Sequence, residues 1–134
     1  MKRLACLCAL FFAGHVMAQT TCSNATLSGN YIASSKNGTL AAGVNIFVEA
    51  LVASNGAGTI NANFSYTESG GLLNGTTAET IAYTVNSDCS LTANAILAGI
   101  PVTVRGHVSP DGNKVVLIAY GPGIALNGTG DKVP

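Results

Sequence analysis

The stretch YTVNSDCSLTANA, residues 83–95, decides how this chain is expected to fold. On both sides of the polar triplet Asn86-Ser87-Asp88, residues that favour strands alternate with small polar residues. A short run of Asn, Ser and Asp between two such segments is typical of a tight turn. The stretch therefore predicts two antiparallel strands joined by a hairpin, with Cys89 just after the bend.

The first 18 residues have the three parts of a secretory signal peptide. The start is basic, an apolar run follows over residues 4–12, and a small-residue cleavage site ends at Ala18. The apolar run is shorter than the roughly 20 residues that a helix needs to span a bilayer. We therefore expect residues 1–18 to be removed and residues 19–134 to form one secreted or periplasmic domain.

Two cysteines remain after that cleavage, Cys22 and Cys89, because Cys6 and Cys8 lie in the apolar run. An exported chain folds in an oxidising compartment, where a disulfide is the default expectation for such a pair. A Cys22–Cys89 bond would tie the start of the mature chain to its middle. The alternative is two free thiols.

Turn signals rich in Gly, Asn, Asp and Pro divide the mature chain into strand-like runs, and helical periodicity is nearly absent. The predicted turns lie at residues 35–38, 54–58, 68–71, 86–88, 97–101, 109–113 and 120–123. The predicted strands lie near residues 29–35, 43–53, 58–68, 72–86, 89–97, 101–109, 113–120 and 123–131.

Short connections between these runs favour an antiparallel meander, since none is long enough for a crossover helix. An open sheet of eight strands would expose two edges, and closure removes them. The sequence therefore predicts an all-β fold, an eight-stranded antiparallel up-and-down β-barrel whose interior holds packed side chains or one small ligand. A two-sheet sandwich is the structural alternative.

Two of the predicted strands are apolar on both faces, VNIFVEALVA at residues 44–53 and KVVLIAY at residues 114–120. A strand in a one-layer barrel needs only one apolar face. We therefore expect the outer face of these strands to be covered or to form a subunit contact, which makes a homo-oligomer an expected assembly.

Sparse charge limits the classes of partner. Residues 19–134 hold four of the six basic residues and all six acidic ones, without a basic stripe, so nucleic acid is not an expected partner. Stable membrane insertion is not expected either, because the strands lack aromatic girdles and the final DKVP lacks a terminal aromatic residue.

Three stretches carry a resemblance to a known family: TCSNATLSGNYIA at 21–33, SNGAGTINANFSYTESG at 54–70 and IAYTVNSDCSLTANA at 81–95. Together they resemble small bacterial secreted proteins related to the allene oxide cyclase barrel-like domains, within the calycin-type barrels. The resemblance implies an eight-stranded barrel and suits a Cys22–Cys89 pair. It also implies either cyclase activity on a polyene or ketone intermediate or no assigned activity.

The mature chain has no sequence motif that by itself indicates a catalytic activity. It has one histidine, so a histidine-rich metal site is not expected. It has no phosphate-loop motif either, and no cofactor is expected. Glu49, Arg105 and His107 are the candidate catalytic residues, because a carboxylate or a cation that faces a barrel lumen could act on a substrate. Glu68 and Glu79 also fall in predicted strands. The alternative is that all four strand charges, Glu49, Glu68, Glu79 and Arg105, face water or lie near the barrel rims.

Aromatic side chains are the candidates for contact with a ligand in the lumen: Phe64, Tyr66, Tyr83 and Tyr120. Tyrosine hydroxyls could also donate hydrogen bonds to it. Plain packing is the alternative, because aromatic residues in small barrels often only fill the core.

Three functions follow from these patterns. The first is a binding module that holds a small apolar ligand in the lumen. The second is a cyclase or isomerase without a metal or nucleotide cofactor, and the third is a structural or surface protein with a filled barrel. The size of the interior cavity distinguishes the ligand hypotheses from the structural one.

Overall fold

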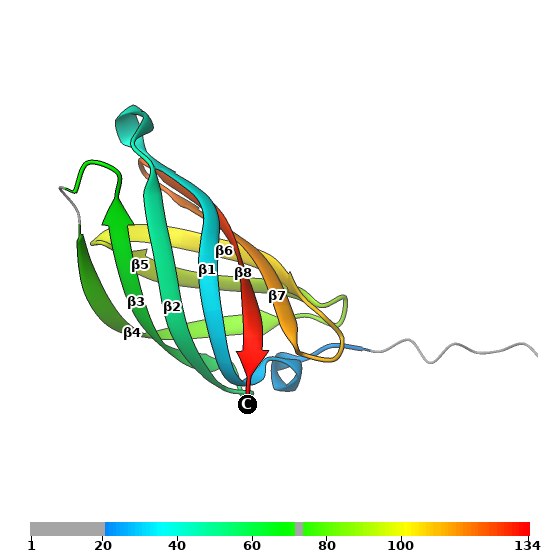
Figure 1. Ribbon diagram of the computed structural model, residues 1–134. Helices are drawn as coiled ribbons and strands as arrows, with labels where there is room; N and C mark the ends of the chain where they lie inside the picture. Colours follow the sequence, from blue (N-terminus) through cyan, green and yellow to red (C-terminus); the bar gives the residue numbers. More distant parts are fainter. Residues whose placement is uncertain (1–20, 72–73) are drawn as a thin grey trace, which may run out of the picture.

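Within residues 21–71 and 74–134, which the computed structural model describes, eight antiparallel strands close into a barrel (Figure 1). The strands are β1 (Ser28–Leu40), β2 (Ile46–Asn55), β3 (Thr59–Glu68), β4 (Asn74–Val85), β5 (Ser90–Leu97), β6 (Ile100–Val108), β7 (Lys114–Gly121) and β8 (Ile124–Val133). Each strand pairs with the next, and β8 pairs with β1. The predicted up-and-down barrel is confirmed, and the two-sheet sandwich is wrong.

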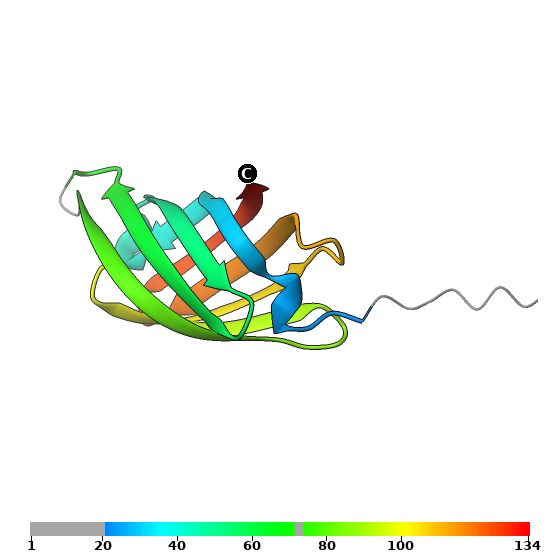
Figure 2. The same ribbon diagram turned by 90° about the horizontal axis from the view of Figure 1, so that it is seen from below.

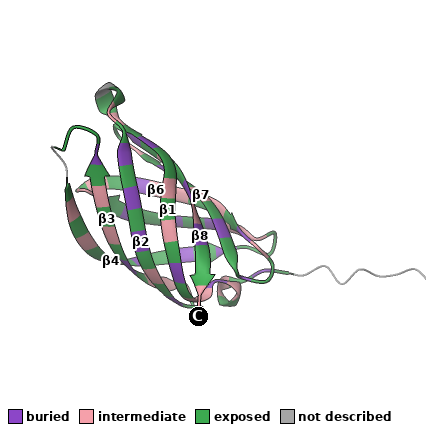
Figure 3. Cartoon of the chain, in the orientation of Figure 1, coloured by how far each residue is buried: buried purple, intermediate pink, exposed green. Residues whose placement is uncertain are grey.

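Alternation along each strand separates the core from the surface. In β2, Ile46, Val48 and Ala50 are buried inside the barrel, whereas Phe47 and Leu51 are exposed. Figure 3 shows this pattern as alternating buried and exposed bands along the strands. Burial of the inner face of every strand removes apolar side chains from water, and this hydrophobic effect stabilises the closed barrel.

The first predicted turn, residues 35–38, is wrong. β1 continues through it to Leu40, with a bulge between Ser35 and Asn37 where it pairs with β8. A Cβ atom at Gly38 would lie 2.5 Å from the carbonyl oxygen of Ile46, so the glycine permits close packing rather than a reversal of the chain. The chain turns instead at the 3₁₀ helix η2 (Ala41–Gly43).

The segment before β1 is fixed at one end of the barrel (Figure 2). The predicted disulfide is confirmed: Cys22 is bonded to Cys89 after the β4–β5 turn. The 3₁₀ helix η1 (Asn24–Thr26) follows, and the Asn24 side chain accepts a hydrogen bond from the Val85 N–H at 2.7 Å. Leu27 is buried, so this segment helps to fill the end of the barrel.

The predicted signal peptide, residues 1–18, lies outside the described residues, as do the first two residues of the predicted strand 72–86. Within the described parts of the chain, no helix has the length and hydropathy to cross a membrane.

Candidate functional site: an apolar cavity inside the barrel

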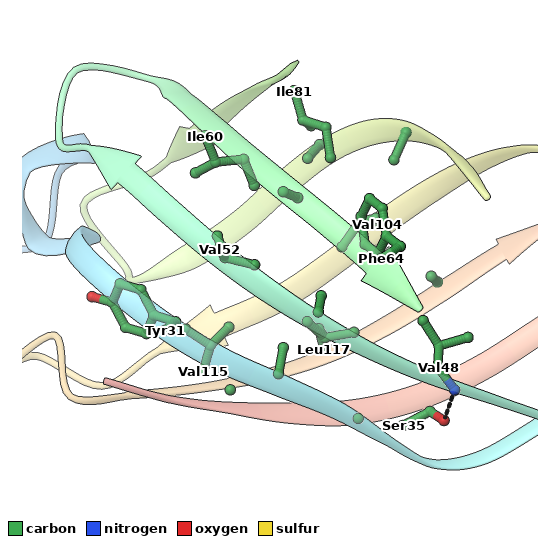
Figure 4. A pocket seen from close by; sticks show the side chains of 18 of the residues that line it. Tyr31, Ser35, Val48, Val52, Ile60, Phe64, Ile81, Val104, Val115 and Leu117 are labelled. Atoms are coloured by element: carbon green, nitrogen blue, oxygen red, sulfur yellow. Dashed lines mark hydrogen bonds between the residues drawn. The ribbon is translucent and has the colours of Figure 1, made fainter. Parts of the chain in front are cut away.

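The barrel interior contains a cavity of about 140 Å³ (Figure 4). All eight strands contribute to its wall, and Val52, Ile60, Phe64, Val104 and Leu117 are among the side chains that face it. An apolar cavity of roughly 150 Å³ stays free of water and can hold benzene or xenon. Pockets for drug-sized ligands are larger, roughly 300–1,000 Å³. The cavity therefore matches one small apolar molecule.

Small residues at inward-facing positions explain why the interior is not filled. The lining includes six alanines and two glycines: Ala33, Ala50, Ala62, Ala93, Ala95, Ala119, Gly128 and Gly130. A barrel of eight strands has just enough interior for medium-sized side chains to fill it. With alanine or glycine at so many inward-facing positions, the side chains leave space between them.

Tyrosine hydroxyls lie at the end of the barrel that η1 covers, rather than in the cavity. The Tyr83 hydroxyl lies 2.9 Å from Ser54 Oγ and 3.0 Å from the carbonyl oxygens of Asn24 and Leu27. The Tyr31 hydroxyl donates to the carbonyl oxygen of Gly112 at 2.7 Å. Both rings contribute apolar edges to the cavity while their polar ends bind the loops.

Burial raises the pKa of the Tyr31 hydroxyl above its ordinary value, and the neighbouring Tyr83 and Asp111 raise it further. Desolvation disfavours the phenolate, as would the negative charge of Asp111. The hydroxyl is therefore held in its neutral, donating form.

The four aromatic candidates take three kinds of position: two line the cavity, one packs against the core and one is exposed on the outer wall. Phe64 and Tyr83 line the cavity. Tyr66 is half-buried and lies across Gly75, where a Cβ atom would be 2.7 Å from its hydroxyl oxygen. Tyr120 is 41% exposed on the outer face of β7, so its expected place in the lumen is wrong.

The three charged candidates all lie outside the barrel. Glu49 is exposed on β2 opposite Ser65, because Val48 and Ala50 take the inward positions on either side of it. Arg105 and His107 are exposed on β6. None of these three side chains lines the cavity, so the lumen position that the cyclase hypothesis requires of them is not found.

Two other carboxylates fall at inward-facing register positions. Glu68, at the end of β3, is 8% exposed. Glu79, on β4, accepts a hydrogen bond from the backbone N–H of Ile96 on β5 at 2.9 and 3.0 Å to its two oxygens. The period-two pattern of Ile81, Tyr83 and Val85 could have placed Glu79 on the inner face, but the sequence gives no sign of its partner.

Groups of three His, Cys, Asp or Glu side chains that could hold a metal ion are absent from the described residues. Comparison with protein-family models, with curated proteins and with solved structures found no match. The site is therefore interpreted from its own geometry, and the relation to allene oxide cyclase-like barrels stays a prediction.

Proposed function

We propose that this protein is a binding module that holds one small apolar molecule in the barrel lumen. The observation that carries the proposal is the interior cavity of about 140 Å³ with its apolar lining. Water gains little in such a space because it finds few hydrogen-bond partners, whereas an apolar molecule leaves water and gains dispersion contacts. A molecule the size of a benzene ring or a short hydrocarbon fits the volume.

The disulfide is compatible with an extracellular or periplasmic protein. Export through residues 1–18 belongs to the proposal, since these residues lie outside the described chain. In this reading the barrel collects its ligand outside the cytoplasm.

The cyclase or isomerase alternative has less support. It needs a polar group that can polarise or protonate a substrate at the cavity, and the charged candidates Glu49, Arg105 and His107 are on the outer surface. The hydroxyls of Tyr31 and Tyr83 are turned to the loops. No observation of the cavity favours chemistry over binding.

The structural or surface-protein alternative expects a filled barrel, and the cavity argues against that. It also expects self-association, and one observation favours this. Val116, Ile118 and Tyr120 form an apolar stripe along the outer face of β7 and are between 41% and 61% exposed. Self-association through this stripe is compatible with ligand binding in the lumen.

Substitution inside and outside one strand tests the binding proposal. Ala50 faces the cavity from β2, and Ala53 is exposed on the same strand. Benzene binding should be measured by calorimetry and by NMR shifts of the cavity methyl groups. Ala50→Leu fills part of the cavity and should weaken binding by roughly tenfold or more, in line with the cost of overpacking.

The matched control is Ala53→Leu, which adds the same atoms on the surface and should leave benzene affinity unchanged. Equal binding by both variants would place the benzene elsewhere. If the unmodified barrel takes up neither benzene nor xenon, the proposal is wrong.

A further inference from the structure

One boundary of the barrel wall is much shorter than the others. Seven neighbouring strand pairs are joined over six to ten paired residues each. β4 and β5 are joined over three, from Tyr83 opposite Ala93 to Val85 opposite Leu91. Beyond Tyr83 the strands are not paired in the described chain. In the register of the paired residues, residues 79–82 of β4 lie opposite residues 94–97 of β5, and we call this unpaired boundary the seam. The two strands can be followed in Figures 1 and 2.

The seam borders the cavity on its inner side. Ile81 on β4 and Ala95 and Leu97 on β5 belong to the unpaired stretches, and all three line the cavity. The seam also meets a shallow groove on the outer side, whose wall includes Ile96 and Tyr120. The Glu79 side chain starts from an inward-facing register position of β4 and also lines this groove. Ala95 and Val102 line both the groove and the cavity, so a single layer of residues separates them there.

Buried side chains occupy both ends of the barrel. At one end Leu27 and the hydroxyl contacts of Tyr83 hold the segment before β1 in place, and the disulfide fixes that segment covalently. At the other end Ile46 is completely buried and Ile124 is 4% exposed. A ligand that passed through either end would have to displace packed side chains, whereas at the seam it would break few strand-to-strand hydrogen bonds.

The Glu79 side chain connects the two strands across the seam. If the β4–β5 register continued beyond Tyr83, the N–H of Ile96 would meet the backbone of Thr80. Its partner is the Glu79 carboxylate instead, through both oxygens. A hydrogen bond to an ionised acceptor is stronger than a neutral one, so this side chain is a local latch across a gap in the ladder.

We propose that the β4–β5 seam is the portal through which a small apolar molecule reaches the lumen, and that Glu79 is the latch that keeps it closed. The exposed Ile96 and Tyr120 give an arriving apolar molecule a surface beside the portal. This inference rests on the proposed function, but it concerns rates of exchange rather than affinity.

Removal of the latch is the first test. Glu79→Ala should raise the association and dissociation rates of benzene together by roughly tenfold, because a charge-assisted hydrogen bond no longer opposes opening. The dissociation constant should stay unchanged, since Glu79 does not touch the cavity. Glu49→Ala, at a position that is paired with both neighbouring strands, is the matched control and should change neither rate. Equal rates in Glu79→Ala and in the unmodified protein, measured by NMR exchange, would overturn the portal.

A chemical bridge is the second test. Thr80→Cys with Asn94→Cys, joined by a short bis-maleimide that leaves the native disulfide intact, should slow benzene exchange by roughly tenfold or more without changing its affinity. The same bridge between Ser65→Cys and Thr76→Cys, a directly paired position of β3 and β4, is the control and should have no effect. Exchange that stays fast with the seam bridged would show that the ligand enters elsewhere.

A ligand-free measurement separates failure of the portal from failure of the binding proposal. A thiol placed in the lumen by Ala50→Cys should react with methyl methanethiosulfonate roughly tenfold faster when Glu79→Ala is added, and no faster with Glu49→Ala. If benzene does not bind but this acceleration is seen, the binding proposal fails and the portal stands. If benzene binds and the thiol reacts equally fast in all backgrounds, the portal fails and binding stands.

Discussion

Tyr31 and Tyr83 show how single residues in this barrel serve the cavity and the loops together. Each ring lines the apolar cavity, and each hydroxyl binds a backbone carbonyl at the barrel end. The sequence named Tyr83 as one of four aromatic candidates for the lumen, and its ring lines the cavity. It could not identify the partner of the Tyr31 hydroxyl, because Gly112 is 81 positions away. Such a long-range contact depends on how the barrel closes.

The Tyr31 hydroxyl provides a test at the residue scale. Tyr31→Phe removes its hydrogen bond to Gly112 and should lower the free energy of unfolding by about 1 kcal/mol near pH 8. The raised pKa means that the folded state favours the neutral phenol. The contribution of this hydrogen bond to stability is therefore complete below the ordinary tyrosine pKa of 10.0 and is lost as the pH rises through the higher pKa of the folded state.

The difference in unfolding free energy between the unmodified protein and Tyr31→Phe should accordingly shrink between pH 8 and pH 11, measured by urea unfolding. Tyr120→Phe, on the exposed face of β7, is the control and should show no difference at pH 8. A Tyr31→Phe difference that grows at alkaline pH would contradict the burial argument.

At the scale of elements, β5 begins and ends at unusual backbone conformations. Cys89 has φ of 67° just before the strand, and Ala98 has φ of 51° just after it. Both turns were predicted from their composition, because Asn-Ser-Asp and Ala-Gly between strand-like runs indicate hairpins. The Ser35–Gly38 stretch has the same composition but forms a bulge in β1. Local composition cannot distinguish a turn from a bulge when the pairing partner, β8, lies at the far end of the chain.

Ala98 provides a test at the element scale. Ala98 and Gly99 form a two-residue β5–β6 turn with φ of 51° and 78°, and an alanine side chain is strained in this left-handed region. Asn adopts it more readily, so Ala98→Asn should raise the free energy of unfolding by about 0.5–1 kcal/mol. The measurement is thermal or urea unfolding. Ala57→Asn, at an exposed loop position without a positive φ, is the control and should not raise the free energy of unfolding. A lower free energy of unfolding in Ala98→Asn would contradict the argument from backbone strain.

For the whole molecule, the sequence predicted closure, strand order and the disulfide, because period-two alternation and short connections leave few arrangements open. It could not predict the cavity, whose volume depends on inward-facing residues of all eight strands at once. Glu49 illustrates the same limit. Its same-face neighbours Phe47 and Leu51 are apolar, a pattern that favours the lumen from sequence alone, yet both are more than half exposed on the outer wall. A strand that is apolar on both faces does not reveal which face is buried.

Those outer apolar residues provide a test at the scale of the molecule. The β7 stripe of Val116, Ile118 and Tyr120 leaves apolar area in water that a second copy of the chain would cover. We expect sedimentation velocity to detect a concentration-dependent dimer, and Val116→Thr with Ile118→Thr to shift it to monomer. Thr84→Ser, on the exposed face of β4, should leave the dimer intact. A protein that is monomeric at every concentration would contradict this expectation.

The covalent link between Cys22 and Cys89 has a consequence for damage to the chain. A protease that cuts one loop between these two residues produces two fragments that are still joined by sulfur. The nicked molecule would keep the segment before β1 at the end of the barrel. It would migrate as one species in denaturing electrophoresis until a reductant is added. Survival of a single cut is thus a property of the topology, independent of how tightly any strand is held.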